Sequence, residues 1–165
     1  MPTANSLNGL YAMIKQRASA AMEDEVFEEV RDVYQKHIDS DVYDAYSPAS
    51  DVRRDVRGGL IADENIVGNM SGESLEVKNV TPPSESIATF GQSFAPESDT
   101  QLMDWIEHGA AYHGNAKYIF NRDMSGEPWA NPRPATQNTI DDLRANGQHI
   151  EALKRGLKSR GIDSR

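Results

Sequence analysis

The sequence of 165 residues contains no cysteine, so disulfide bonds and thiolate metal sites are excluded, and the composition fits a reducing cytosol. It contains no apolar run of about 18 residues, the length that a membrane-spanning helix requires. Residues 1–6 lack both the charged region and the apolar region of a secretory signal peptide. These absences lead us to expect a protein that is made in the cytosol and binds no membrane.

Positive charge is scarce, because 17 Lys and Arg residues stand against 26 Asp and Glu residues, which gives a formal net charge of −9. Broad binding to a nucleic-acid backbone needs a basic face that releases counterions, so we exclude it over most of the surface. The hydrophobic content of 38% is modest, but a chain of this length can bury one core. We therefore expect a single domain over residues 1–165.

Apolar residues recur at steps of three and four from Leu7 to Ile38 with no proline between them, which predicts a long amphipathic helix. We assign residues 1–38 to this helix, either unbroken or as two helices in line. Between residues 23 and 32 it carries six carboxylates and one arginine, a net charge of −5. This acidic face is either solvated or an electrostatic surface for a neighbouring subunit. Its candidate contact residues are Glu25, Glu28 and Glu29.

The middle of the chain predicts a loop followed by a β-hairpin. Residues 39–63 hold several aspartates and a Gly-Gly pair with little periodicity, which is typical of a loop. Strand-like runs at residues 66–70 and 74–80 flank a Ser-Gly-Glu turn. This pattern predicts a β-hairpin within residues 64–95.

Three further segments follow the hairpin. Residues 87–94 favour another short strand, and residues 97–109 predict a helix that Asp99 caps. Residues 110–131 place aromatic side chains among glycines and a proline, which predicts an irregular aromatic insertion. Such insertions often pack at interfaces, because rigid rings bury a large area.

Two prolines, Pro132 and Pro134, fix the start of the C-terminal segment, because no helix continues across them. Residues 132–161 predict a helix pair, in which Asn146-Gly147 ends the first helix and Gly161 ends the second. The complete pattern is α+β, with a long N-terminal helix, a small antiparallel sheet with a β-hairpin, and a C-terminal helix pair.

The one cluster that is typical of chemistry is Glu107, His108 and His113, since histidine and carboxylate side chains bind zinc or transfer protons. The two histidines are five residues apart, which is about 140° around a helix, so the spacing argues against a metal site. The sequence has no HExxH motif, nucleophile elbow, Walker loop or GxGxxG motif. We therefore predict no enzyme, no catalytic residue, no metal and no cofactor. A small metal-dependent hydrolase is the lesser alternative.

Basic residues gather in two places. Arg53, Arg54 and Arg57 are either solvent-exposed side chains of a loop or pair with the acidic helix face of another copy. Residues 150–165 carry a net charge of +3, so an acidic front and a basic end suit head-to-tail contact, which closes into a ring when the rotation allows. The other candidate interface residues are Trp105, Glu107, Tyr112, Trp129, Arg133, Lys154, Arg155 and Lys158. Lys158 and Arg160 are also placed to complement the dipole of the last helix.

Several short motifs follow one another along residues 10–162. They are Val42-Tyr43-Asp44-Ala45-Tyr46-Ser47-Pro48, Arg53-Arg54, Gly58-Gly59-Leu60, Trp105-Ile106-Glu107-His108-Gly109 and Pro132-Arg133-Pro134. With the acidic helix, the hairpin and the last helix, this order resembles the small head–tail connector proteins of tailed bacteriophages, variously called neck, tail-completion or minor tail-component proteins. The chain departs from that pattern in the aromatic insertion and at Ala135-Thr136, where that family commonly has a bulky apolar residue.

The resemblance implies a structural virion protein that forms a ring at the head–tail junction, as a neck, tail-terminator or tail-completion protein, and joins the portal complex to the tail. Its partners would be copies of itself, in a hexamer or a dodecamer, and the neighbouring portal, adaptor, stopper and tail-tube proteins. DNA would at most pass through the ring lumen, without sequence-specific binding. The protein would be made in the host cytoplasm and reside in the virion. The alternative is an assembly chaperone or binding module that the virion does not retain.

Overall fold

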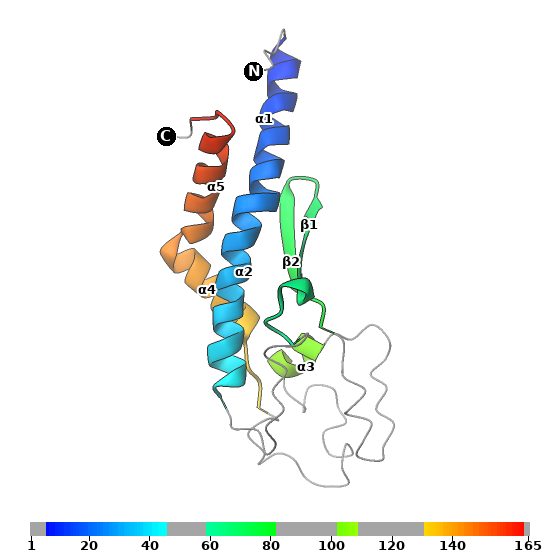
Figure 1. The fold of residues 1–165 in the computed structure, drawn as a ribbon, viewed down its shortest axis with the longest axis vertical. Coiled ribbons are helices and arrows are strands. Elements are labelled where there is room, and N and C mark those ends of the chain that lie inside the picture. Colours follow the sequence, from blue (N-terminus) through cyan, green and yellow to red (C-terminus); the bar gives the residue numbers. More distant parts are fainter. Residues whose placement is uncertain (1–5, 46–58, 82–101, 109–130, 164–165) are drawn as a thin grey trace. The chain divides into compact units, whose positions relative to one another are not determined.

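The structure, a computed structural model, describes residues 6–45, 59–81, 102–108 and 131–163 (Figure 1). One β-hairpin separates the N-terminal helical elements from the C-terminal helices, and the predicted α+β class is confirmed. In chain order they are α1 (Leu7–Ala21), the π-helical turn η1 (Met22–Val26), α2 (Phe27–His37), a second π-helical turn η2 (Ile38–Tyr43), the 3₁₀ turn η3 (Asp63–Asn65), β1 (Ile66–Ser71), β2 (Ser74–Asn79), α3 (Leu102–His108), α4 (Ala135–Asn146) and α5 (Gln148–Ser159).

Two compact units make up the chain, and each is described by itself. Unit 1 comprises Met1–Val33, Gly68–Val77 and Asp141–Arg165, and unit 2 comprises Tyr34–Val67 and Lys78–Ile140.

The long N-terminal helix begins at Ser6, whose Oγ accepts a hydrogen bond of 3.1 Å from the backbone N–H of Gly9. The helix does not end near Ile38, because η2 continues to Tyr43. The predicted loop is therefore wrong over residues 39–43. Ile38 and Val42 lie one turn apart and are 0% and 3% exposed, so burial of this apolar pair outweighs the preference of the intervening aspartates for turns.

The β-hairpin is confirmed close to its predicted bounds, with β1 and β2 as an adjacent pair. Its base in unit 2 is held by buried amides that bind the chain just before the hairpin. Asn79 Nδ2 donates to the Leu60 carbonyl at 2.7 Å, and Asn65 Nδ2 donates to the Gly59 carbonyl at 2.8 Å. Residues 59–62, expected as part of a loop, are thus fixed by satisfied buried hydrogen bonds.

The two predicted helix stops in the C-terminal segment are confirmed. Gly147 and Gly161 have φ angles of +65° and +76°, in the left-handed region that glycine adopts without a steric penalty. After α5, the N–H of Gly161 bonds the Lys158 carbonyl at 3.0 Å, and the N–H of Ile162 bonds the Leu157 carbonyl at 2.9 Å. This is the Schellman pattern, which satisfies carbonyl groups that the end of a helix leaves open.

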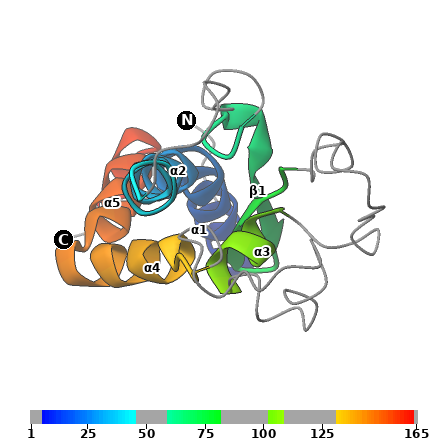
Figure 2. The ribbon, with the colours of Figure 1, turned by 90° about the horizontal axis from the view of Figure 1, so that it is seen from below.

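Small residues line the core of unit 1, where α5 lies alongside the N-terminal helix (Figure 2). Ala21 and Ala152 are both 0% exposed, and Gly156 is buried. A Cβ atom added to Gly156 would lie 2.8 Å from the Ala21 Cβ and 2.6 Å from Glu25 Oε2. The absent side chain therefore permits a close approach of the two helices, which positions the polar contacts of the candidate site.

The core of unit 2 is built from Tyr34, Ile38, Val42, Leu60, Ile66, Met103 and Ala135, each at most 6% exposed. Polar side chains are buried among them, notably Thr81 and Thr139. The Thr139 hydroxyl donates to the Ala135 carbonyl at 2.7 Å, which satisfies it within α4. The predicted strand at 87–94 and the aromatic insertion at 110–131 lie outside the described residues, apart from Asn131.

Candidate functional site

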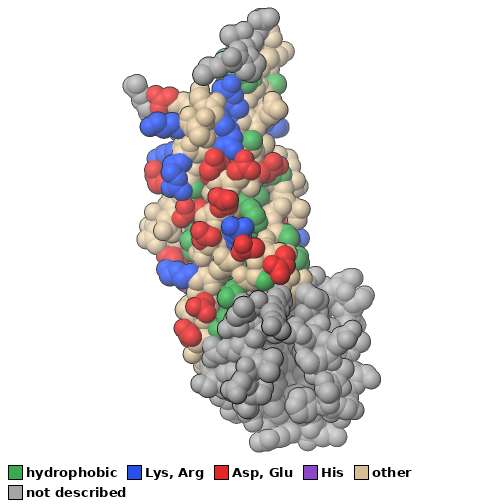
Figure 3. All heavy atoms as spheres, viewed as in Figure 1, with side chains coloured by type: hydrophobic (Ala, Val, Ile, Leu, Met, Phe, Trp, Pro, Cys, Tyr) green, Lys and Arg blue, Asp and Glu red, His purple; other side chains and the backbone are tan. Residues whose placement is uncertain are grey.

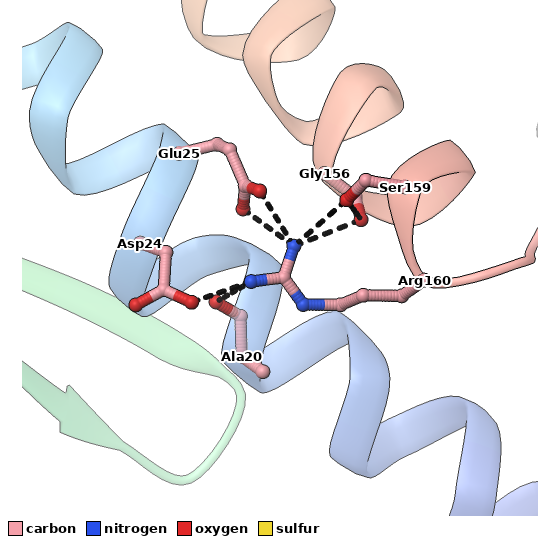
Figure 4. A network of polar contacts seen from close by, with 6 residues as sticks. All are labelled: Ala20, Asp24, Glu25, Gly156, Ser159 and Arg160. Atoms are coloured by element: carbon pink, nitrogen blue, oxygen red, sulfur yellow. Dashed lines mark hydrogen bonds and ion pairs between the residues drawn. The ribbon is translucent and has the colours of Figure 1, made fainter.

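The densest polar network of unit 1 is centred on Arg160, at the C-terminal end of α5 (Figure 4). Its Nη1 donates to both carboxylate oxygens of Glu25 at 2.7 Å and to the Gly156 carbonyl at 2.9 Å. Its Nη2 donates to Asp24 Oδ2 and, at 3.2 Å, to the Ala20 carbonyl. We call this set the Arg160 clasp, because one guanidinium joins the last turn of α5 to the N-terminal helix.

The π-helical turn η1 supplies both carboxylates of the clasp. At its end the Phe27 N–H bonds the Met22 carbonyl, five residues back, so the helix is locally widened. Adjacent residues on a regular helix point about 100° apart, yet Asp24 and Glu25 reach the same guanidinium. The hydrogen bonds from Arg160 outweigh the desolvation of Glu25 and hold the pKa of that carboxyl below its ordinary value of 4.5.

A second ion pair lies beside the clasp, where Arg155 Nη2 is 2.8 Å from Glu29 Oε2. Arg155 is 62% exposed at its side chain, whereas Arg160 is 20% exposed. The acidic front and the basic end, which the sequence led us to expect in contact between copies, thus meet within one chain at Glu25 and Glu29. Figure 3 shows Asp and Glu side chains gathered over the middle of the N-terminal helix, where Glu28 is also exposed.

Two other predicted interface residues of α5 lie on its surface. Lys154 is exposed and pairs with Glu151, one turn earlier, at 2.8 Å. Lys158 is exposed in the last turn, as the helix dipole favours.

The N-terminal end of α1 carries apolar side chains that are open to solvent. Leu7, Leu10, Tyr11 and Ile14 are 66%, 40%, 64% and 39% exposed. We call these four residues the α1 stripe, because steps of three and four residues place them on one side of the helix. A sequence reading that treated all apolar positions of this helix as core could not separate these four from the buried ones.

The stripe lies beyond the elements that flank α1 in unit 1. The hairpin reaches Lys15, whose Nζ is 3.0 Å from Glu73 Oε1. The end of α5 reaches Arg17, whose Nη1 is 3.6 Å from the position of a Cβ on Gly161. Residues 7–14 precede both contacts, and Figure 1 shows α1 continuing past the end of α5 and past the hairpin turn.

In unit 2, Glu107 has a structural position at the start of α4. Its Oε1 accepts a hydrogen bond of 2.7 Å from the backbone N–H of Thr136, so the carboxylate caps this helix and faces its positive dipole end. The Thr136 hydroxyl is 2.9 Å from the Tyr34 hydroxyl. Burial raises the pKa of Tyr34 to about 12, so this phenol stays protonated.

Only part of the histidine and carboxylate cluster lies within the described ranges. His108 is exposed, and His113 lies outside the described residues. No group of three or more metal-ligating side chains occurs within residues 6–45, 59–81, 102–108 and 131–163.

A polar group that the sequence reasoning missed surrounds Asp41 in η2. Its Oδ2 accepts from Asn138 Nδ2 at 2.8 Å and lies 3.3 Å from His37 Nδ1, while its Oδ1 accepts from the Ser40 hydroxyl at 2.8 Å. Burial raises the pKa of Asp41, but these hydrogen bonds and the charge of His37 outweigh burial and lower the pKa overall. His37 and Asp41 are four residues apart, a spacing at which two side chains meet on a helix, so this pair is a sequence signal for helix at residues 37–41.

Arg133 is 8% exposed, and its backbone N–H bonds the Ile106 carbonyl at 3.1 Å. Its guanidinium therefore lies inside unit 2 rather than on an open surface. Trp105 belongs to α3. The remaining predicted interface residues, Arg53, Arg54, Arg57, Tyr112 and Trp129, lie outside the described residues.

No helix in the part of the chain that the structure describes is long and apolar enough to cross a membrane. A family model matches residues 6–159, almost the whole chain. This match identifies the chain as a phage-related protein. The chain belongs to the YomN family. No curated protein and no solved structure matches it.

Proposed function

We propose that this protein is a structural component of a tailed-phage particle, which assembles as a homo-oligomeric ring at the head–tail junction and joins the portal complex to the tail. It acts through contacts with copies of itself and with neighbouring connector and tail proteins, and it carries out no catalysis. DNA passes through the lumen at most, and the protein does not bind it sequence-specifically.

The observation that carries this proposal is the α1 stripe in a chain of a phage-related family. Leu7 and Tyr11 leave about two thirds of their surface in water, at 66% and 64% exposed. Singly exposed apolar residues are ordinary, but adjacent ones on one helix side are typical of a contact surface. A protein that works by assembly needs such a surface.

The charge distribution supports the same role. Arg155 and Arg160 of α5 pair with Glu29 and Glu25, so part of the acidic face is neutralised within the chain. The exposed carboxylates that Figure 3 shows on the N-terminal helix remain unsuited to phosphate binding. The net charge of −9 therefore fits a ring whose outer contacts are with proteins.

Purified protein examined by negative-stain microscopy and sedimentation velocity should form closed rings, and mass spectrometry of purified virions should find the chain. A ring of six or twelve copies would fit the symmetry of a tail or a portal. A monomeric chain that is absent from virions would overturn the proposal. A chain that binds virion proteins during assembly but is missing from finished particles would instead be an assembly chaperone, and would overturn it as well.

A further inference from the structure

We infer that the α1 stripes of neighbouring copies lie side by side and in parallel around the ring axis of the assembled particle. This inference rests on the proposed self-assembly and adds the surface that performs it. The partner is a second copy of this chain, and the contact residues are Leu7, Leu10, Tyr11 and Ile14.

The stripe lies on a helix end that gains little stability from packing against its own chain. Ser6 caps the helix, so its start is well defined, but Leu7 and Tyr11 are mainly in water. Short helices in water are marginal, and most helical stability in proteins comes from packing of an apolar face. Gly9 weakens this end further, because glycine costs about 1 kcal/mol relative to alanine in a helix. A partner on the stripe would supply the missing packing.

The spacing of the stripe is that of a helix–helix seam. Leu7, Tyr11, Ile14, Ala18 and Ala21 follow steps of four, three, four and three residues. This is the alternation of a coiled-coil seam. Ala18 and Ala21, the second half of this seam, already pack within the chain. Ala18 is half-buried, and Ala21 is buried where Gly156 of α5 approaches. The stripe therefore continues a helix contact of unit 1 beyond the end of α5.

The charges favour an identical partner. Residues 1–14 contain no Asp, Glu, Lys or Arg, so two copies of this end bring no like-charged side chains together. Lys15, the first charged residue, is paired with Glu73 of its own chain at 3.0 Å. The acidic residues that would repel a copy begin only at Glu23, about 12 Å further along the axis than Lys15 at 1.5 Å per residue.

Ring symmetry sets the direction of the helices. Rotation about one axis relates every copy in a closed ring, so all α1 helices point the same way along it. Parallel packing brings equivalent residues together, and Tyr11 of one copy would then lie beside Tyr11 of the next. The stripe spans the eight residues from Leu7 to Ile14, little more than one heptad, whereas an independent coiled coil usually needs three or four. It therefore strengthens an assembly that has other contacts.

A cross-linking experiment on the complete chain tests this contact, because the natural sequence has no cysteine. Tyr11→Cys places one thiol in the stripe. Gln16→Cys is the matched control, since Gln16 is also exposed on α1 but lies on the opposite side of the helix. Under mild oxidation, Tyr11→Cys should form disulfide-linked dimers at least tenfold faster than Gln16→Cys. Equal rates, or faster linkage of the control, would overturn the inference.

A second pair of variants tests the energy of the contact. Tyr11→Glu should weaken self-association about tenfold or more, because it puts a charge in place of an aromatic side chain that the proposed contact buries, whereas Gln16→Glu should leave association unchanged. Far-UV circular dichroism confirms that both variants keep their helix content. Unchanged association of Tyr11→Glu would count against the stripe.

The outcomes separate this inference from the proposed function. Rings that form without preferential linkage at residue 11 overturn the stripe contact alone. Preferential linkage in a chain that never forms rings and is absent from virions supports the stripe and overturns the connector role. A chain that stays monomeric at all concentrations overturns both.

Discussion

Replacement of Arg160 by methionine should loosen α5 from the N-terminal helix. Methionine keeps an unbranched apolar stem and removes the guanidinium, so the packing of the stem is largely retained while the clasp is lost. The carboxylates of Asp24 and Glu25 are then left close together without the cation that joins them to α5. The expected result is a larger population of molecules in which α5 is detached.

The size of the effect follows from the exposure of the partners. A hydrogen bond to a charged group contributes about 1.5–3 kcal/mol when shielded, and an exposed ion pair contributes less than about 1 kcal/mol. Glu25 is 29% exposed and binds through both oxygens, whereas Asp24 is 69% exposed. We therefore expect a loss of about 2 kcal/mol, mostly from Glu25, which is about a 30-fold change in the opening equilibrium.

Native-state hydrogen exchange of the α5 amides measures this opening directly. Arg155→Met is the matched control, because it removes the same kind of side chain from the same helix and breaks one ion pair. Arg155 is 62% exposed, so this control should cost about 0.5 kcal/mol or less. If both variants lowered protection equally, or if Arg160→Met left it unchanged, the clasp would not be what holds α5.

Three further results are expected. Gly156→Ala should destabilise the protein by about 1–2 kcal/mol in urea denaturation, because the added methyl group overpacks the contact between α5 and the N-terminal helix by more than the gain in helix propensity. Gly9→Ala, at an exposed position of α1, should be neutral or stabilising. Equal effects of the two substitutions would contradict the close approach of the helices at Gly156. Because the folded-state pKa of Glu25 lies below 4.5, its contribution is present above pH 4.5 and is lost as the pH falls through that lower value. Glu25→Gln should accordingly flatten the acid-induced rise in α5 exchange, and an identical pH profile would refute this. Glu107→Ala should cost the first turn of α4 about 1 kcal/mol, seen as faster exchange at the Thr136 amide, while Glu107→Gln should retain much of the protection.

Local patterns in the sequence predicted much of the fold. The hairpin, the glycine stops at Gly147 and Gly161 and the long N-terminal helix depend on neighbours within a few residues, so their signals are present in short windows. The extension to Tyr43 is hard to predict, because the aspartates between Ile38 and Val42 favour a turn while the burial of these two apolar side chains, which the sequence does not show, favours the helix.

The candidate site was less accessible from sequence, because its contacts join distant segments. Glu25 and Arg160 are 135 residues apart, and the charge pattern could not decide between a partner in the same chain and one in another copy. The π-helical turns have no sequence signature that would have revealed them. The exposed stripe has the same three and four residue spacing as the buried seam. It is exposed because α5 and the hairpin end before they reach it, and the spacing does not show where those elements end.

The turn η1 also has a consequence for how this helix can vary. One residue more or less within Met22–Val26 rotates everything before it by about 100° about the helix axis, since each residue contributes that angle. A single deletion there would turn Tyr11 away from the side on which α5 packs, without altering the composition of either segment. The length of this turn therefore sets the direction in which the α1 stripe points about the helix axis, relative to the residues of α2 that follow the turn.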